Sequence, residues 1–195
     1  MCNNQNNRMF AYDNLMDYDY LKELFDKANE DFLSDELDII RSNVTERMLC
    51  GSLKTKLEMY LQQDNVGGYH VDLEYNRNQG HVKTIIDDEL HIVNIVCDLI
   101  IHSRGQNVRQ DNLLALEMKK SYRSQKEKDS DRRRLIALTK NTFNNDIWSY
   151  DGITFPEHVC RYIIGIYYEI DLPNNRILLE YYRHGMLKNR TTINL

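Results

Sequence analysis

The chain is poor in residues that interrupt or cross-link a fold. Of its 195 residues, two are proline, eight are glycine and four are cysteine. No cysteines are spaced as Cys-x-x-Cys, which argues against a zinc ribbon or a thioredoxin-like motif. The longest apolar runs, such as Leu99–Ile101 and Leu113–Leu116, fall far short of the ~18 residues that span a bilayer. The polar, asparagine-rich start has no apolar signal region, so we expect a reduced, cytoplasmic protein without membrane contact.

Several common functional fingerprints are missing as well. The sequence has no P-loop, no dinucleotide-binding glycine pattern and no nucleophile elbow, which excludes the usual NTPase, dehydrogenase and α/β-hydrolase interpretations. The hydrophobic fraction of 42% and the charged fraction of 28% are typical of a globular domain. No Pro-, Gly- or Ser-rich linker divides the chain, and its length favours a single domain with additions.

The net charge of −5 conceals a strongly basic segment. Lys119–Arg134 contains eight Lys or Arg and three Asp or Glu, a net charge of +5, so the rest of the chain carries −10. This asymmetry is more informative than the total charge. A solvated loop and helix start would account for it, and so would a surface that meets a phosphate backbone.

Two helices are predicted before the first strand. The first spans 17–40, with Asp17 or Asp19 as its cap, and belongs to a helical extension over 1–42 that packs on the core. The second spans 43–62, with Asn43 as N-cap. Glu46 then lies on the stripe of apolar leucines, where a carboxylate costs free energy unless something pairs with it. Glu46 is therefore either a simple capping residue or part of a site.

The remainder, within a domain over 43–195, alternates strands and one helix. A polar segment with Arg104-Gly105 suits a hairpin turn between the second and third strands. The order predicts an α/β fold with a mixed sheet flanked by helices. The predicted strands are 69–75, 94–102, 112–119, 161–168 and 176–182, and the predicted helix runs from Asp129 or Asp131 to Asn144.

Polar residues interrupt two of the otherwise apolar strands. Glu117 and Lys119 are two residues apart and share a face of one strand, and the hairpin partner can place Asp98 across from them. Two buried carboxylates repel each other, and a divalent cation between them removes that cost. Two carboxylates, a backbone carbonyl and waters form a site that Mg²⁺ accepts. The lysine would stabilise charge on a phosphate, and ordinary ion pairing is the alternative explanation.

These residues resemble the D…(D/E)xK signature of the PD-(D/E)XK nuclease superfamily. The element order also resembles the restriction-endonuclease-like αβββαβ core, here with an extra N-terminal helix and a C-terminal strand. One departure is Cys97, which stands where the family name has proline. The likeness covers about residues 43–170. It is carried by Glu46-Arg47, 57–61, 71–77, Cys97–His102 and Asn112–Ser121.

The resemblance implies a Mg²⁺-dependent nuclease that hydrolyses phosphodiester bonds, most readily in DNA, with Mn²⁺ as a substitute metal. Asp98 and Glu117 would be metal ligands, with the Met118 carbonyl as a third. Lys119 would assist the attacking water, and Glu46 would complete the catalytic set. The basic run after the catalytic strand adds four expected nucleic-acid contacts, Lys120, Arg123, Lys126 and Lys128.

Two alternatives to a free-standing enzyme stay open. The acidic total charge and the acidic, aromatic first helix favour a non-catalytic module that keeps the fold and binds a partner. A nuclease subunit of a larger complex is the intermediate case. If a chain with one site cuts both DNA strands, a homodimer is favoured.

Overall fold

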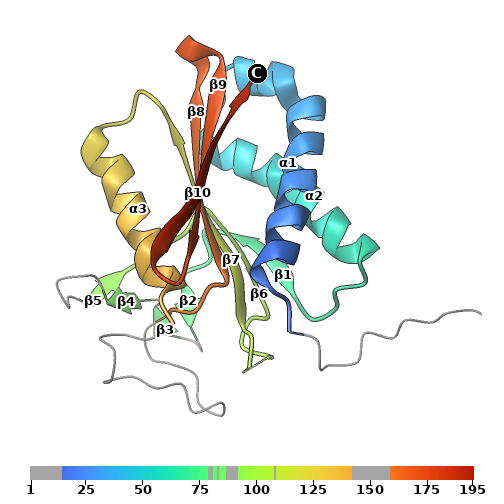
Figure 1. The fold of residues 1–195 in the computed structure, drawn as a ribbon, viewed down its shortest axis with the longest axis vertical. Coiled ribbons are helices and arrows are strands. Elements are labelled where there is room, and N and C mark those ends of the chain that lie inside the picture. Colours follow the sequence, from blue (N-terminus) through green and yellow to red (C-terminus); the bar gives the residue numbers. More distant parts are fainter. Residues whose placement is uncertain (1–14, 79–80, 83, 87–91, 108, 142–158) are drawn as a thin grey trace, which may run out of the picture.

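The computed structural model describes residues 15–78, 81–82, 84–86, 92–107, 109–141 and 159–195. In this part of the chain three α-helices pack on the two faces of a six-stranded mixed sheet, which confirms the predicted mixed α/β class. Helices α1 and α2 cover one face and α3 covers the other (Figure 1). None of the helices within these ranges is long and apolar enough to cross a bilayer.

Side-chain caps decide where the first two helices begin. Helix α1 spans Tyr18–Arg41, and the predicted cap Asp17 accepts a backbone hydrogen bond from its first turn. Helix α2 spans Glu46–Gln63, and its N-cap is Thr45 rather than the predicted Asn43. Asn43 has a left-handed φ of 60°, whereas an N-cap residue needs an extended backbone.

The main sheet is antiparallel except at one pair. Its strands, in spatial order, are β1 (His70–Leu73), β6 (Leu99–His102), β7 (Asn112–Lys120), β8 (Ile164–Asp171), β9 (Arg176–Arg183) and β10 (Met186–Asn194). The parallel pair is β7 and β8, and helix α3 (Gln125–Thr139) connects them. The 3-10 helix η1 (Leu172–Asn174) joins β8 to β9. Two small ladders lie apart from the sheet: β2 (Arg77–Asn78) with β3 (His81–Val82), and β4 (Thr84–Ile86) with β5 (Ile92–Asn94).

Helix α3 begins earlier than predicted. Its first residue is Gln125, not Asp129 or Asp131, because the Ser124 side chain caps the helix and Glu127 bonds back to it in a capping box. The predicted end of this helix, 142–144, lies outside the described residues. Because the helix begins at Gln125, Lys128 of the basic segment lies on the helix face that packs on the sheet.

Two strands also differ from their predicted limits. The predicted strand 94–102 begins only at Leu99, because Ile92–Asn94 pairs with β4 instead. Strand β10 was not predicted at all. Almost all of its side chains are exposed, so no apolar alternation marks it in the sequence.

The two faces of the sheet bury separate apolar clusters. Strand β7 sends Leu116 and Met118 into the cluster under α1 and α2, and Ala115 into the cluster under α3. Because neighbouring side chains on a strand alternate between faces, Glu117 and Lys119 follow Ala115 onto the α3 side. The candidate site residues of β7 therefore lie under α3.

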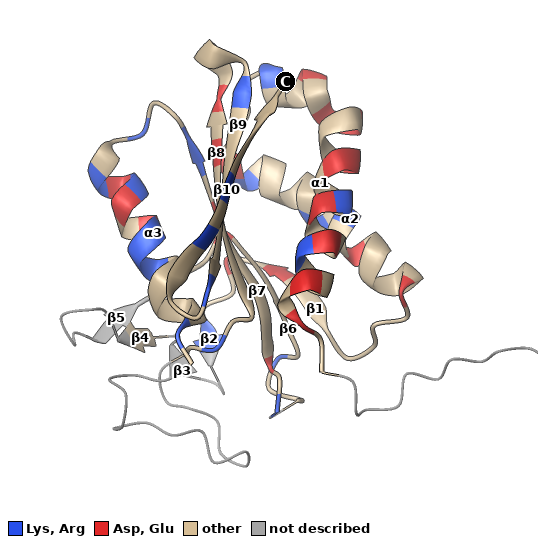
Figure 2. Cartoon of the chain, in the orientation of Figure 1, with Lys and Arg blue, Asp and Glu red and all other residues tan. Residues whose placement is uncertain are grey.

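Helix α1 packs on the sheet through aromatic and polar contacts. The Phe25 ring meets the Tyr181 ring edge-on, with centroids 6.1 Å apart. The buried Tyr168 hydroxyl donates to Asn29 Oδ1 at 2.9 Å. The helix carries eight Asp or Glu and three Lys or Arg, so the α1 side of the molecule is acidic (Figure 2).

A glycine allows close packing between the end of α3 and the sheet. A Cβ on Gly165 of β8 would lie 2.9 Å from Thr139 Cγ2 and 3.4 Å from Tyr182 Cβ. Real Cβ atoms are almost never found at 2.9 Å from another heavy atom. The chain has few glycines, and this one serves close helix–sheet packing.

Candidate active site

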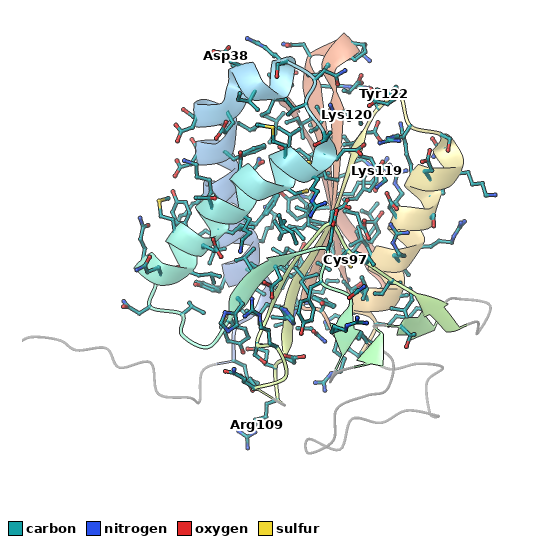
Figure 3. All side chains as sticks on the ribbon, turned by 180° about the vertical axis from the view of Figure 1, so that it is seen from behind. Asp38, Cys97, Arg109, Lys119, Lys120 and Tyr122 are labelled. Carbon is teal, nitrogen blue, oxygen red and sulfur yellow. The ribbon has the colours of Figure 1, made fainter. Side chains whose placement is uncertain are left out.

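The hairpin of β6 and β7 brings three predicted site residues together. Leu99 pairs with Leu116, so Asp98, one residue before β6, lies across from Glu117. Lys119 shares the face of Glu117, and its Nζ lies 3.8 Å from Asp98 Oδ2. Lys119 lies between α2 and α3 near the end of β7 (Figure 3).

Glu117 is fully buried, and only one of its oxygens is bonded. Oε1 accepts a hydrogen bond from Arg134 Nε at 2.9 Å. Oε2 is buried and has no hydrogen-bond partner among the residues that the structure describes. Burial, followed by the nearby Asp98 carboxylate, raises the pKa of Glu117 to about 8, although Arg134 acts in the opposite direction.

Asp98 and Lys119 reach solvent at the edge of the same cluster. The Asp98 side chain is 28% exposed and the Lys119 side chain 17%. Asp98 Oδ2 accepts the Met118 N–H at 2.8 Å, and burial raises the pKa of Asp98 while the Lys119 ammonium opposes this. Burial alone would lower the pKa of Lys119, but Asp98 and Asp131 raise it above its ordinary value. Lys119 is therefore a stable cation and not a proton acceptor at neutral pH.

Sequence reasoning missed two members of the cluster, and both come from α3. Asp131 is buried, and its Oδ2 lies 3.1 Å from Lys119 Nζ. Arg134 bonds to Asp131 Oδ1 as well as to Glu117. The capping box at Ser124 was the signal that could have found them. A helix starting there places Asp131 and Arg134 on the stripe that faces the sheet.

Glu46 lies near this cluster, but its bonds go elsewhere. Its Oε1 accepts the Lys120 N–H at 3.0 Å, and Arg123 donates to both carboxylate oxygens, at 3.2 and 2.9 Å. Burial raises the pKa of Glu46, but these bonds and the Lys119 charge lower it below its ordinary value. Glu46 thus ties α2 to the turn after β7 from the face opposite Glu117, and its place in the catalytic set stays a prediction.

The four predicted nucleic-acid contacts divide into two pairs. Lys120 is buried, and its ammonium bonds to Asn43 Oδ1 at 2.6 Å and to the Val44 carbonyl. Lys128 is also buried, with Nζ 3.1 Å from a Glu169 oxygen. Both point into the protein and are bonded there, which argues against contact with a phosphate backbone, and their role in nucleic-acid binding stays a prediction. Lys120 alternates away from Lys119 on β7, and Lys128 lies on the sheet-facing stripe of α3.

The other two predicted contacts, Arg123 and Lys126, lie at the surface. They belong to the segment between the end of β7 and the first turn of α3. These exposed cations therefore follow Lys119 closely along the chain, and the Lys119 side chain is itself partly exposed.

A second buried glutamate on the same face shows what full pairing looks like. Glu180 of β9 is fully buried and accepts bonds from Arg132 Nε at 2.8 Å, Arg190 Nη2 at 2.7 Å and the Tyr182 hydroxyl at 2.7 Å. Burial raises its pKa, but these donors hold the pKa below the ordinary value. The pKa of Glu117 shifts in the opposite direction, because burial outweighs its single donor and the acidic neighbour Asp98 adds to the rise.

The donor set of the cluster suits a hard divalent cation. Among the described residues, no group of three or more His, Cys, Asp or Glu side chains is placed to hold a metal ion. Asp98 and Glu117 supply two carboxylates, and one Glu117 oxygen has no partner. Mg²⁺ binds through one or two carboxylates and keeps several waters, so two carboxylates and the Met118 carbonyl fit it. The absence of a histidine or thiolate set argues against a zinc site in this cluster.

Comparison of the chain with models of protein families, with curated proteins and with solved structures gave no match. The chemistry of the cluster therefore carries the functional conclusion. That chemistry consists of a buried carboxylate with one unbonded oxygen, a second, partly exposed carboxylate and a lysine that the nearby Asp98 and Asp131 keep protonated.

Proposed function

We propose that the protein is a metal-dependent nuclease that hydrolyses phosphodiester bonds, with DNA as its substrate. The observation that carries the proposal is the unbonded Oε2 of the buried Glu117, beside Asp98 and on the same face as Lys119. The order α2, β1, β6, β7, α3, β8 supports the finer proposal of a restriction-endonuclease-like core.

In this proposal each side chain has a separate task. Asp98, Glu117 and the Met118 carbonyl hold Mg²⁺, which when bound supplies positive charge that activates water and polarises the phosphate. Lys119 stabilises the negative charge that develops on the phosphate oxygens. Asp131 keeps Lys119 protonated and in place at 3.1 Å, and Arg134 orients Glu117.

The distribution of charge supports an approach of the substrate from the α3 side. The α1 side is acidic and would repel a phosphate backbone (Figure 2). Three exposed cations lie before and along α3, namely Arg123, Lys126 and Arg133. A nucleic acid that avoids α1 and contacts these cations meets Asp98 and Lys119.

One observation favours a second candidate, the non-catalytic interaction module. Arg134 already bonds to Glu117, and Asp131 already pairs with Lys119. These contacts stabilise the cluster without a metal, as expected of a fold that uses its surface to bind a partner. The two candidates differ in whether the cluster binds Mg²⁺ or Mn²⁺.

The test combines cleavage with metal binding. Supercoiled plasmid and circular single-stranded DNA are incubated with the protein and Mg²⁺ or Mn²⁺, and Mn²⁺ binding is measured by calorimetry. Glu117→Gln and Lys119→Met should each lower the cleavage rate about 100-fold or more, because each removes a charge that acts on the transition state. Glu117→Gln should also weaken Mn²⁺ binding, whereas Lys119→Met should not.

Matched controls are available in the same chain. Glu180→Gln changes an equally buried, arginine-paired glutamate outside the cluster, and Lys54→Met changes a partly buried lysine paired with Glu58 on α2. Both should cleave like the wild type, and activity should co-elute with the protein. Cleavage that survives Glu117→Gln and Lys119→Met would contradict the proposal. A wild-type protein that neither cleaves DNA nor binds Mn²⁺ would favour the interaction module.

A further inference from the structure

An exposed aromatic ring stands next to the candidate active site. Tyr122 is 68% exposed, the largest exposed fraction among the large hydrophobic side chains that the structure describes. It follows Lys119 by three residues, so the two backbones are at most about 10 Å apart. Figure 3 places Tyr122 beyond the end of β7, close to Lys119 and Lys120.

The turn that carries Tyr122 is held on both sides. The Ser121 N–H bonds to the Ile170 carbonyl at 2.9 Å, which continues the pairing of β7 with β8. The Arg123 N–H bonds to the Lys120 carbonyl at 3.0 Å, and α3 begins two residues later. Tyr122 therefore projects from a bonded turn, which fixes where its ring can meet a ligand.

A cation lies over the ring and is itself fixed. The guanidinium carbon of Arg123 is 5.7 Å from the centroid of the Tyr122 ring. Two of the Arg123 nitrogens bond to Glu46, at 3.2 and 2.9 Å. The third nitrogen, Nη1, has no bonded partner among the described residues and can contact a phosphate. The exposed Lys126 adds a second cation four residues after Tyr122.

An exposed ring next to fixed cations is the arrangement with which proteins bind single-stranded nucleic acid. In a continuous duplex the faces of each base are covered by its neighbours in the stack, so a ring at the protein surface cannot stack on a base unless the base pairs are separated. A single strand offers the base faces themselves. The ring, the guanidinium and the candidate active site thus suit the same unpaired strand.

We propose that Tyr122 stacks on an unpaired base next to the scissile phosphate, so that the substrate is a single-stranded nucleic acid or a single-stranded segment of one. Arg123 Nη1 and Lys126 contact its phosphates. This proposal rests on the proposed nuclease function, because only a nuclease has a scissile phosphate. The binding of the strand, however, is measurable without cleavage.

The experiment measures binding by fluorescence anisotropy in EDTA. The probes are a labelled 12-nucleotide single-stranded DNA, the RNA of the same sequence and a hairpin-closed DNA duplex. The proteins are the wild type, Tyr122→Ala, Tyr122→Phe and Met186→Ala. Met186 is 54% exposed in β10, so it controls for the loss of any exposed apolar side chain.

Tyr122→Ala should weaken single-strand binding about 5- to 150-fold, because each stacked base contributes about that much to affinity. Tyr122→Phe keeps the ring and should stay within about twofold of the wild type, as should Met186→Ala. Duplex affinity should change less than about twofold in every variant. The tighter of the DNA and RNA strands identifies the sugar that the site accepts.

Two results would overturn the inference: unchanged single-strand affinity in Tyr122→Ala, or an equal loss for single strand and duplex. The nuclease proposal fails separately. If the wild type cleaves nothing but binds single strands through Tyr122, the stacking site stands without the nuclease. If cleavage depends on Glu117 and Lys119 while Tyr122→Ala binds single strands like the wild type, only the stacking site is lost.

Discussion

Glu117 should make the metal-free protein less stable as the pH rises from about 5 to about 8. Its pKa is near 4.5 in an unfolded chain and about 8 in the folded protein. Between these values the folded protein holds a proton at Glu117 that the unfolded chain has lost. Unfolding then releases a proton, so a rise in pH favours the unfolded state. The stabilisation is complete below about pH 4.5 and is lost as the pH approaches 8.

The size of the effect follows from the shift. One pKa unit corresponds to about 1.4 kcal/mol, so the free energy of unfolding should fall by about 3 kcal/mol between pH 5 and pH 8. Urea titrations in EDTA at pH 5, 6, 7 and 8, followed by circular dichroism, measure it. The signal is the difference between the wild type and Glu117→Gln, because groups common to both cancel.

Glu180→Gln separates this cause from the general effect of a buried amide. The pKa of Glu180 lies below its ordinary value, so Glu180 is ionised throughout this pH range and its replacement should leave the slope unchanged. Equal slopes in the wild type and Glu117→Gln would refute the reasoning. They would mean that Arg134 keeps Glu117 ionised despite its burial.

Two further predictions concern the placement of α3. Ser124→Ala removes the side-chain oxygen that accepts the Glu127 N–H and should lower the free energy of unfolding by about 1 kcal/mol. Gln125→Ala, one residue further on, should stay within about 0.5 kcal/mol of the wild type in the same urea titration. Gly165→Ala puts a methyl group 2.9 Å from Thr139 Cγ2 and should cost about 1–3 kcal/mol. An unchanged urea midpoint in Gly165→Ala would contradict the close approach of α3 to β8.

The central residues of the candidate site could be predicted from the sequence because the strands that carry them are otherwise apolar. Asp98, Glu117 and Lys119 stand out against apolar neighbours, and the short polar segment between their strands leaves an antiparallel hairpin as the simple connection. Strand parity then places the three side chains on one face. The same parity, applied to Lys120, would have turned that lysine away from the site.

The partners of the site residues could not be predicted in the same way. Charged residues along α3 resemble a solvated helix face, and the capping box at Ser124 indicates which of them face the sheet but not which opposite charges they meet there. Asp131 and Arg134 were found only when the structure placed α3 against β7. Strand β10 could not be predicted because its side chains carry no apolar pattern. It is held by its backbone pairing with β9 and buries almost none of its side chains.

The ionic contacts under α3 also define where the helix can lie along its own axis. Along this helix, Lys128 meets Glu169, Asp131 meets Lys119, Arg132 meets Glu180 and Arg134 meets Glu117. A slide of one helical turn, about 5.4 Å, would leave all four sheet residues without these partners. These four contacts between charged side chains therefore specify a single axial position for α3.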